Sequence, residues 1–440
     1  MKYLALLIGV LGFGAAEGLP AGGGQESAGP VTIHFMTPEV ELPPQLLERF
    51  MAANPDIELV RLEEDYTRLV AELAAGTPPD LARMGFGTDV AYFARRGLLY
   101  DLTDFLSKSR SIRLQDIDQL GSACYRYDGK QFGKGPWYGL CKDYNNIGCI
   151  TYNREHFRAA GIADLSETEP ISYLDELYLL AKKLTRKDST GRIQRWGLDF
   201  SEYWVPYLVS DMATAAGWSL FADEDRSRMN EDPRVRALWK YWLRFPVEDI
   251  SSNIRNLAPD WPGATFASGR LAMVQLGYWF GAQLMENQGY DKRYGWAPTP
   301  VLRAGSPRCT NNLGATGVFV AARTRHPREA FRVFEWYLAG EIAVERARTG
   351  WGIPPLLSLR RYLPEDNAYN ASRKRIAFED ARYLLAAQAS PYTWGGLTFG
   401  DWSNSLRVLV EGTIDEELFI DLMYKELNAY MKQGKEELGP

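Results

Sequence analysis

The sequence lacks any run of basic residues. Its 440 residues include 50 Lys and Arg against 56 Asp and Glu, which gives a formal charge of −6. A protein that binds DNA or RNA neutralises phosphates with clustered Lys and Arg. We therefore expect no nucleic-acid partner.

Familiar catalytic motifs are also missing. The sequence has no GxSxG, no HExxH and no GxxxxGK[ST], and Gly85-Phe86-Gly87 lacks the third glycine of a dinucleotide-binding loop. Paired carboxylates can serve a glycosidase. With 56 acidic residues, however, some pairs arise by chance. The sequence therefore does not predict an enzyme.

Histidine and cysteine are scarce. The three His residues are far apart and no CxxC occurs, so we expect no metal site and no cofactor. Four cysteines are compatible with an oxidising compartment, where thiols can pair. Cys124 and Cys141 flank a predicted turn at 127–130, which makes them one candidate pair. Cys149 and Cys309 leave other pairings open.

Apart from its N-terminus, the chain has no long hydrophobic run. Lys2 is followed by an apolar segment at 3–13 and by small residues at 14–16. This segment is too short for a membrane-spanning helix of about 20 residues, and the pattern predicts a signal peptide at 1–16. Residues 17–30 predict a flexible spacer. We expect an exported protein, periplasmic or extracellular, without a lipid anchor because no Cys lies near the leader.

Strand and helix patterns alternate from residue 31 onward. Apolar patterns predict strands at 31–35, 57–62 and 80–84. Helical periodicity predicts helices from Pro44 and over 66–75. This order is typical of an α/β fold with a parallel sheet, in which ligands bind beyond the carboxyl ends of the strands. The loops that follow the three strands should therefore share one rim.

Several large aromatic residues lie at helical spacing. Trp239 and Trp242 share one face of a helix that is predicted to begin at Pro233, and Phe331 and Phe334 share one face of a later helix. Large aromatic residues on one helical face usually pack into a core. We predict core packing for these four.

A series of short motifs runs along the chain. The first is a helix–AaGxxPDv–strand–helix–GxLxdL pattern at 71–102, and crossover-like segments follow at 137–140 and 150–154. An FxxGKaAM-like strand lies at 266–273. A second crossover with its helix follows at 317–321 and 326–330, and a tG-x-iP-like element lies at 349–354. In this order and spacing they resemble the solute-binding proteins of ATP-binding-cassette (ABC) importers, in the sugar-binding group that includes maltose-binding protein. One departure is Cys141, which stands where that group usually has Pro.

The resemblance implies a two-lobed α/β fold. Each lobe would hold a mostly parallel sheet flanked by helices, with crossover strands between the lobes and a hinge that closes on a ligand. One lobe would comprise residues 31–147 plus 315–365, and the other 148–314 plus 366–440.

The resemblance also implies a ligand site in the cleft. A sugar ring offers an apolar face to aromatic side chains and hydroxyl groups to carboxylates and amides. The aromatic candidates are Trp279, Trp402 and Trp204, with Trp351 and Trp394 as possible additions. The other candidates are Phe86, Asp89, Glu64 and Glu39 from the first lobe and Asp143, Tyr144 and Asn145 from the crossover.

Trp279 lies in a stretch with three adjacent aromatic residues. We predict that Arg270–Leu276 forms a buried strand and that Gly277 ends it. Trp279 then faces the cleft, and its neighbours Tyr278 and Phe280 serve packing.

The predicted function is a non-enzymatic, monomeric protein that binds a carbohydrate, an oligosaccharide by preference, and delivers it to a membrane permease. Other solutes of the same fold are the alternatives: glycerol phosphate, a polyamine or iron. An anion is disfavoured because no Arg or Lys cluster lies on the predicted rim. An extracellular glycosidase with an aromatic cleft is the alternative from another class.

Overall fold

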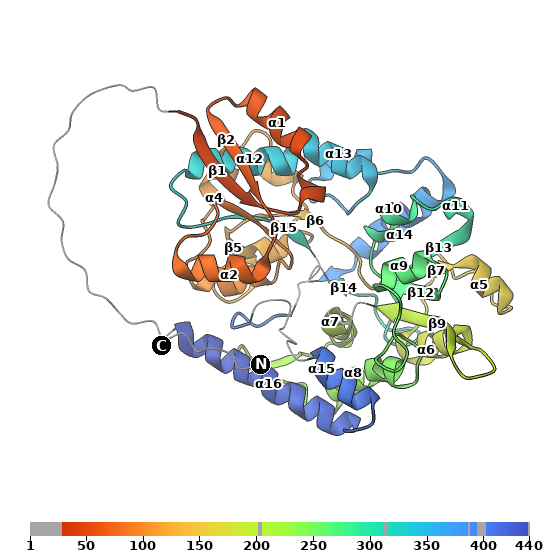
Figure 1. Ribbon diagram of the computed structural model, residues 1–440. Coiled ribbons are helices and arrows are strands. Elements are labelled where there is room, and N and C mark those ends of the chain that lie inside the picture. The colour runs from red at the N-terminus through yellow and green to blue at the C-terminus, as the bar shows by residue number, and fades with distance from the viewer. Residues whose placement is uncertain (1–28, 201–204, 312–314, 386–387, 394–401, 439–440) are drawn as a thin grey trace, which may run out of the picture.

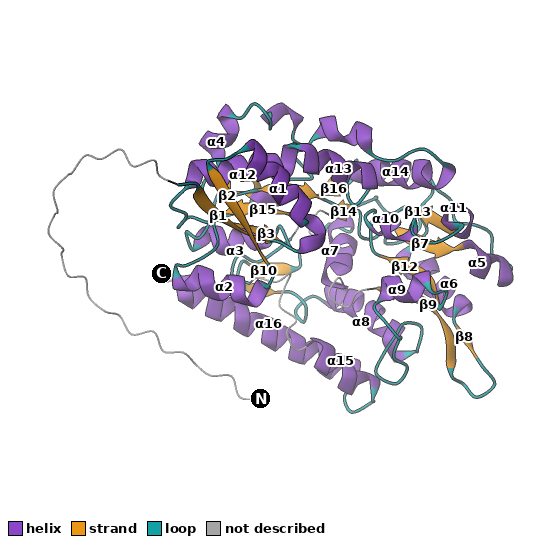
Figure 2. Ribbon diagram, turned by 45° about the horizontal axis from the view of Figure 1, so that its top comes forward, coloured by secondary structure: helices purple, strands orange, loops and turns teal. Residues whose placement is uncertain are grey.

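The computed structural model describes residues 29–200, 205–311, 315–385, 388–393 and 402–438 (Figure 1). The predicted signal peptide and most of the predicted spacer lie outside this part of the chain. Two five-stranded sheets, each flanked by helices, form two lobes (Figure 2). The two-lobed α/β fold is confirmed.

The N-terminal lobe is built on the sheet β2-β1-β3-β15-β6. Strands β1, β2, β3 and β6 run in one direction, and β15 opposes them. The strands span Val31–Met36 (β1), Ile57–Leu62 (β2), Leu81–Met84 (β3), Leu140–Asp143 (β6) and Thr316–Val320 (β15). The helices include α1 (Pro44–Ala53), α2 (Tyr66–Ala75), α3 (Asp89–Arg95), α12 (Pro327–Ala339) and α13 (Glu341–Thr349). The predicted strand–helix alternation from residue 31 to 84 is confirmed.

The C-terminal lobe is built on the sheet β13-β7-β12-β9-β8. Here β13, β12 and β9 share one direction while β7 and β8 oppose them, so the sheet is mixed. The strands span Ile150–Asn153 (β7), Arg186–Lys187 (β8), Ile193–Phe200 (β9), Leu271–Gln275 (β12) and Tyr294–Ala297 (β13). The helices include α6 (Tyr178–Leu184), α7 (Val205–Ala215), α8 (Pro233–Val247), α10 (Phe280–Leu284), α14 (Ala368–Ala381), α15 (Trp402–Val410) and α16 (Glu416–Leu438).

The predicted aromatic core residues are buried. Trp239 and Trp242 lie in the core of the C-terminal lobe, and Phe331 and Phe334 lie in that of the N-terminal lobe. Helix α8 begins where predicted, since the side chain of Asp232 accepts a hydrogen bond from the backbone N–H of Arg234 at its N-terminus. A polar cap such as Asp232 acts on the residues that directly follow it, so the start of the helix can be recognised from the sequence.

The expectation that Cys124 and Cys141 pair is wrong for this structure. The turn between them exists, because β4 (Arg126–Tyr127) pairs with β5 (Phe132–Trp137) in a hairpin. Both cysteines enter the same N-terminal core but remain free thiols, as do Cys149 and Cys309. Burial raises the pKa of the Cys124 thiol to about 12 and that of Cys141 well above its ordinary value. These thiols therefore stay protonated at neutral pH.

The lobes are connected by the crossover segment between β6 and β7. In this segment Tyr144 forms two backbone hydrogen bonds with Ile353 of the N-terminal lobe. The N–H of Tyr144 donates to the carbonyl oxygen of Ile353 at 3.1 Å, and the N–H of Ile353 donates to that of Tyr144 at 3.0 Å. The next but one residue, Asn146, donates from Nδ2 to Asp380 of helix α14 in the C-terminal lobe at 2.8 Å. The crossover is therefore held on both sides.

Helix α16 makes a second contact between the lobes. It belongs to the C-terminal lobe but extends beneath the N-terminal lobe towards α2 (Figures 1 and 2). Its end is bonded to Arg96, whose Nη2 lies 3.0 Å from Gly434 O and 3.1 Å from Glu437 Oε2. No helix within the described residues is both long and apolar enough to cross a membrane.

Candidate functional site

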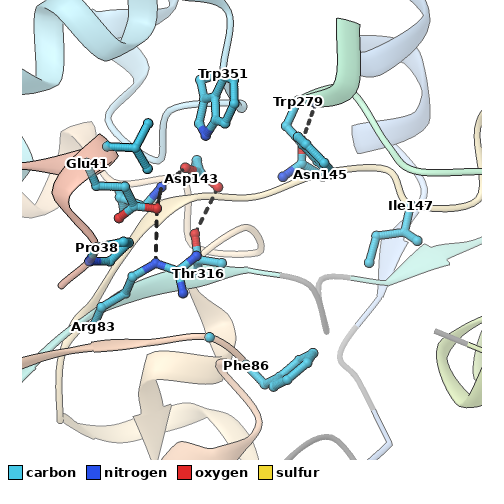
Figure 3. A pocket seen from close by; sticks show the side chains of 13 residues that line it. Pro38, Glu41, Arg83, Phe86, Asp143, Asn145, Ile147, Trp279, Thr316 and Trp351 are labelled. Carbon is cyan, nitrogen blue, oxygen red and sulfur yellow. Dashed lines mark hydrogen bonds and ion pairs between the residues drawn. The ribbon is translucent and has the colours of Figure 1, made fainter. Parts of the chain in front are cut away.

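A cavity of about 420 Å³ lies between the lobes (Figure 3). It opens beyond the carboxyl ends of β1, β3 and β6 in the N-terminal lobe and of β12 in the C-terminal lobe, where ligands of α/β sheets bind. The lining residues are Pro38, Val40, Glu41, Arg83, Gly85, Phe86, Lys142, Asp143, Asn145, Ile147, Trp279, Thr316 and Trp351.

A cluster of charged residues forms one side of the cavity. Lys142 Nζ lies 3.2 Å from Glu41 Oε1 and is also bonded to the carboxylate of Asp143. Arg83 Nε donates to Glu41 Oε1 at 3.0 Å, and its Nη1 donates to Glu64 Oε1 at 2.7 Å. Two cations thus meet three carboxylates in this charged cluster, and the charge of Arg346 also acts on Glu41.

Hydroxyl groups complete the hydrogen bonding of two of these carboxylates. Thr316 Oγ1 donates to Asp143 Oδ1 at 3.0 Å, and Tyr337 OH donates to Glu41 Oε2 at 2.8 Å. Each carboxylate is therefore oriented before a ligand enters. Groups that are already fixed lose little conformational entropy on binding, and this favours affinity.

The charged cluster predicts a pH dependence of stability. Burial alone would raise the pKa of Glu41, but Lys142, Arg83 and the hydrogen bond from Tyr337 outweigh burial and lower that pKa from 4.5 to about 2. A folded-state pKa below the unfolded one stabilises the fold above pH 4.5, and this stabilisation is lost as the pH falls from 4.5 to 2. The expected loss is about 3 kcal/mol.

Urea denaturation between pH 5 and pH 2 measures this loss, with Glu41→Gln as the control because it cannot titrate. The slope of unfolding free energy against pH should be smaller in Glu41→Gln than in the native chain. Equal slopes would show that Glu41 does not hold this depressed pKa.

Two tryptophans form the aromatic side of the cavity. Trp279 of the C-terminal lobe and Trp351 of the N-terminal lobe have ring centroids 5.9 Å apart, at 56°. Figure 3 shows both above the cavity, across from Arg83 and Phe86. Trp261 stacks on Trp279 from outside the cavity, at 6.0 Å and 13°.

Local backbone geometry presents Trp279 to the cavity. Strand β12 ends at Gln275, and Gly277 has a φ of +85°, in the left-handed region that favours glycine. The backbone N–H of Trp279 donates to Asn145 Oδ1 of the crossover at 2.9 Å. The turn is thereby anchored to the segment that joins the lobes.

A second aromatic contact bridges the lobes on the opposite side. Phe86 follows β3 in the N-terminal lobe, and its ring lies 5.7 Å from that of Tyr207 on α7 in the C-terminal lobe. Ile147 of the crossover packs against both. The cavity thus has apolar contacts at two edges and the charged cluster between them.

Four of the predicted site residues line the cavity: Trp279, Phe86, Asp143 and Asn145. Tyr278 and Phe280, predicted to serve packing, are buried on either side of Trp279. The predicted strand before them is β12.

Four other candidates lie elsewhere. Tyr144 is buried in the N-terminal core and donates to Asp118 Oδ2 at 2.8 Å, because alternate residues of an extended segment face opposite sides. Asp89 is buried at the start of α3 and accepts a hydrogen bond from Tyr66 OH. Neither lines the cavity.

The remaining two acidic candidates also lie outside the cavity lining. Glu64 does not line the cavity itself, but it forms an ion pair with Arg83, which does. Glu39 is exposed and pairs with Arg61 at 3.2 Å. A short 3-10 turn spans Glu39–Glu41, and the side chain of Glu41 is only 7% exposed.

Trp204 and Trp394 lie outside the described residues. Trp402 begins helix α15, and its side chain is outside what the structure describes.

Sequence reasoning missed Glu41 and Arg83, and it placed Lys142 in the cleft-lining stretch without naming it as a ligand residue; all three line the cavity. The expectation that no Arg or Lys cluster lies on the rim is therefore wrong, because Arg83 and Lys142 both line the cavity. A signal existed: a Lys and an Arg inside otherwise apolar strand patterns are rarely buried unless they are paired. Trp351, named as a possible addition, lines the cavity.

A larger chamber of about 560 Å³ adjoins the cavity. The two spaces share Val40, Glu41 and Trp351, and the chamber extends between α1 and α13 on one side and α10 on the other. The two spaces therefore lie on either side of these three residues. Among the residues that the structure describes, no group of three His, Cys, Asp or Glu is placed to hold a metal ion.

Solved structures share this fold. An ABC substrate-binding protein from Listeria monocytogenes in complex with cycloalternan is 19% identical, with a TM-score of 0.72 over 92% of this chain and 99% of that chain. An ABC transporter solute-binding protein from Thermotoga lettingae bound with alpha-D-tagatose is 18% identical, with a TM-score of 0.70 over 92% and 100%. The maltose/maltodextrin-binding domain from Bdellovibrio bacteriovorus bound to maltotriose is 20% identical, with a TM-score of 0.67 over 92% and 99%. At these identities the likeness establishes the fold.

The sequence itself matches one family. Comparison with curated proteins gives no significant match. Residues 45–369, which contain strands of both sheets and every cavity-lining residue except Pro38, Val40 and Glu41, match the family model described as bacterial extracellular solute-binding protein. This match covers more than half of the chain, so the chain belongs to the bacterial extracellular solute-binding proteins.

Proposed function

We propose that this protein binds a carbohydrate between its lobes and delivers it unchanged to an ABC permease. One observation carries the proposal: Trp279 and Trp351 face a cavity whose other side is a cluster of oriented carboxylates and cations. Aromatic rings cover the apolar face of a sugar, and charged groups with fixed geometry bind its hydroxyls. The chemistry of the two sides matches the two faces of a sugar ring.

An oligosaccharide suits the site better than a single sugar. The adjoining chamber shares Val40, Glu41 and Trp351 with the cavity, so it is the nearest space for further sugar units. Cycloalternan and maltotriose occupy two proteins of the same fold, which supports this reading.

The charged cluster disfavours the other solutes. An anion such as glycerol phosphate would meet Arg83 and Lys142, but both of these cations already pair with carboxylates. A polyamine would have to displace Lys142 from Glu41 and Asp143, or Arg83 from Glu41 and Glu64. A neutral polyol needs neither change.

We also propose that the protein is exported and that its lobes close on the ligand. Residues 1–16 would direct export and be removed without lipid attachment, and the chain would act as a monomer. Lobes at 31–147 plus 315–365 and at 148–314 plus 366–440 would close about the crossovers, and both would dock on the permease.

A saccharide panel tests the proposal. The thermal unfolding midpoint of the mature chain is measured with and without each saccharide. A ligand that binds only the folded state at 100 times its Kd stabilises it by about 2.7 kcal/mol, so the midpoint should rise with one or more saccharides. Spermidine and glycerol 3-phosphate serve as controls. Midpoints unchanged by every saccharide would overturn the proposal, and so would hydrolysis products formed in catalytic amounts, which would favour a glycosidase.

A further inference from the structure

Helix α14 carries a buried guanidinium with little hydrogen bonding. Arg373 is 1% exposed, and its Nε and Nη2 have no hydrogen-bond partner within the described part of the chain. Its Nη1 lies 3.5 Å from Tyr278 O, at the limit of a hydrogen bond. No ion pair joins Arg373 to a carboxylate of the described residues. Burying an unpaired charge is costly, so its position calls for an explanation.

The chain makes room for this guanidinium with two glycines. A Cβ on Gly281 would lie 2.2 Å from Arg373 Nη1, and a Cβ on Gly350 would lie 2.2 Å from Nη2. Gly281 is in α10 of the C-terminal lobe, and Gly350 ends α13 of the N-terminal lobe. The guanidinium therefore lies between the lobes, against backbone from each.

Both contacts lie next to the cavity tryptophans. The Arg373 guanidinium lies over the ring of Tyr278, 4.5 Å from its centroid, and Tyr278 directly precedes Trp279. Gly350 directly precedes Trp351. A cation over an aromatic face is attractive, and this attraction partly replaces the missing carboxylate. Arg373 itself does not line the cavity.

We propose that Arg373 is a positioning residue that joins the Trp279 turn to the Trp351 turn across the cleft. It lies between the two turns as a rigid planar group and sets the spacing of the two indole rings. This inference rests on the proposed function only in taking those rings as the surface that the carbohydrate contacts.

Fluorine NMR of ligand-free protein labelled with 5-fluorotryptophan tests the role. Trp279→Phe and Trp351→Phe assign the two cavity resonances, and Trp242→Phe assigns the control resonance. In Arg373→Met, which keeps most of the side-chain volume, both resonances should shift, while that of Trp242 in the C-terminal core should not. Arg373→Lys keeps the charge and should shift both resonances less. Resonances of Trp279 and Trp351 that stay unchanged in Arg373→Met would overturn the proposal.

Two further variants guard against a general structural effect. Arg195→Met removes another buried guanidinium of the C-terminal lobe, one bonded to Leu184 O rather than to the cleft, and should leave both resonances in place. If Arg373→Met does not fold, Gly281→Ala displaces the guanidinium without removing its charge and should shift both resonances. No shift in Gly281→Ala would likewise count against the proposal.

The saccharide panel distinguishes a failure of the Arg373 role from a failure of the carbohydrate function. Shifts at both tryptophans with no saccharide bound by the native chain would support the role of Arg373 and overturn the carbohydrate function. If the native chain binds maltotriose or another panel saccharide and neither resonance shifts in Arg373→Met, the carbohydrate function is supported and the role of Arg373 is overturned.

Discussion

Lys142→Met is expected to lower the free energy of unfolding by about 3–5 kcal/mol, because it removes one partner from a buried ion-pair cluster. The Lys142 side chain is 1% exposed and contacts Glu41 and Asp143, whose side chains are each 7% exposed. Without the ammonium group, Asp143 loses the cation that is bonded to it, and Arg83 is left to pair with Glu41 and Glu64. Carboxylates in this position must either stay charged without compensation or take up protons.

Urea denaturation at pH 7 measures this loss, and Lys108→Met is the matched control. Lys108 also pairs with a carboxylate, that of Asp104, but both side chains are more than 70% exposed. An exposed pair contributes little, so the control should change stability by less than about 1 kcal/mol. Similar small losses in both variants would show that the Lys142 pairs do not stabilise the fold.

Trp279→Ala is expected to weaken carbohydrate binding by about 10- to 100-fold, which corresponds to about 1.4–2.7 kcal/mol. The indole supplies apolar surface to the cavity and contacts Trp351 across the cleft. Its outer face is already covered by Trp261, so a sugar gains the inner face without first ordering the ring. Stability should fall by about 1 kcal/mol, since the side chain is only half-buried.

Isothermal titration with the saccharide found in the panel measures this loss of affinity. Trp218→Ala is the control, because Trp218 is a half-buried tryptophan of the same lobe that packs against Arg234 away from the cavity. Affinity should be unchanged in the control. Strong destabilisation of Trp279→Ala without loss of affinity would assign Trp279 to core packing.

Local patterns carried most of the fold prediction. The predicted helix at 66–75 and strand at 57–62 match α2 and β2 residue for residue. Their apolar periodicity and their caps lie within the segments themselves, so no distant contact is needed to recognise them. The series of family motifs predicted the two lobes, and the structure confirms them.

Side-chain direction was the harder part of the site. The sequence indicated the crossover 143–145 as a whole, but an extended segment alternates its faces. Which residues face the cavity depends on how the crossover lies between the lobes. In the structure Asp143 and Asn145 line the cavity and Tyr144 does not.

The sequence by itself determined the α/β elements and the family motifs, because each is encoded by neighbouring residues, and the family resemblance of those motifs implied a ligand site in the cleft. Only the tertiary structure decided that Arg83 and Lys142 pair with Glu41, and that Arg373 reaches Gly350. These contacts join residues far apart in the chain, and Coulomb attraction and burial act between them only after folding has brought them together. That is why the aromatic surface around Trp279 was predictable and the charged cluster opposite it was not.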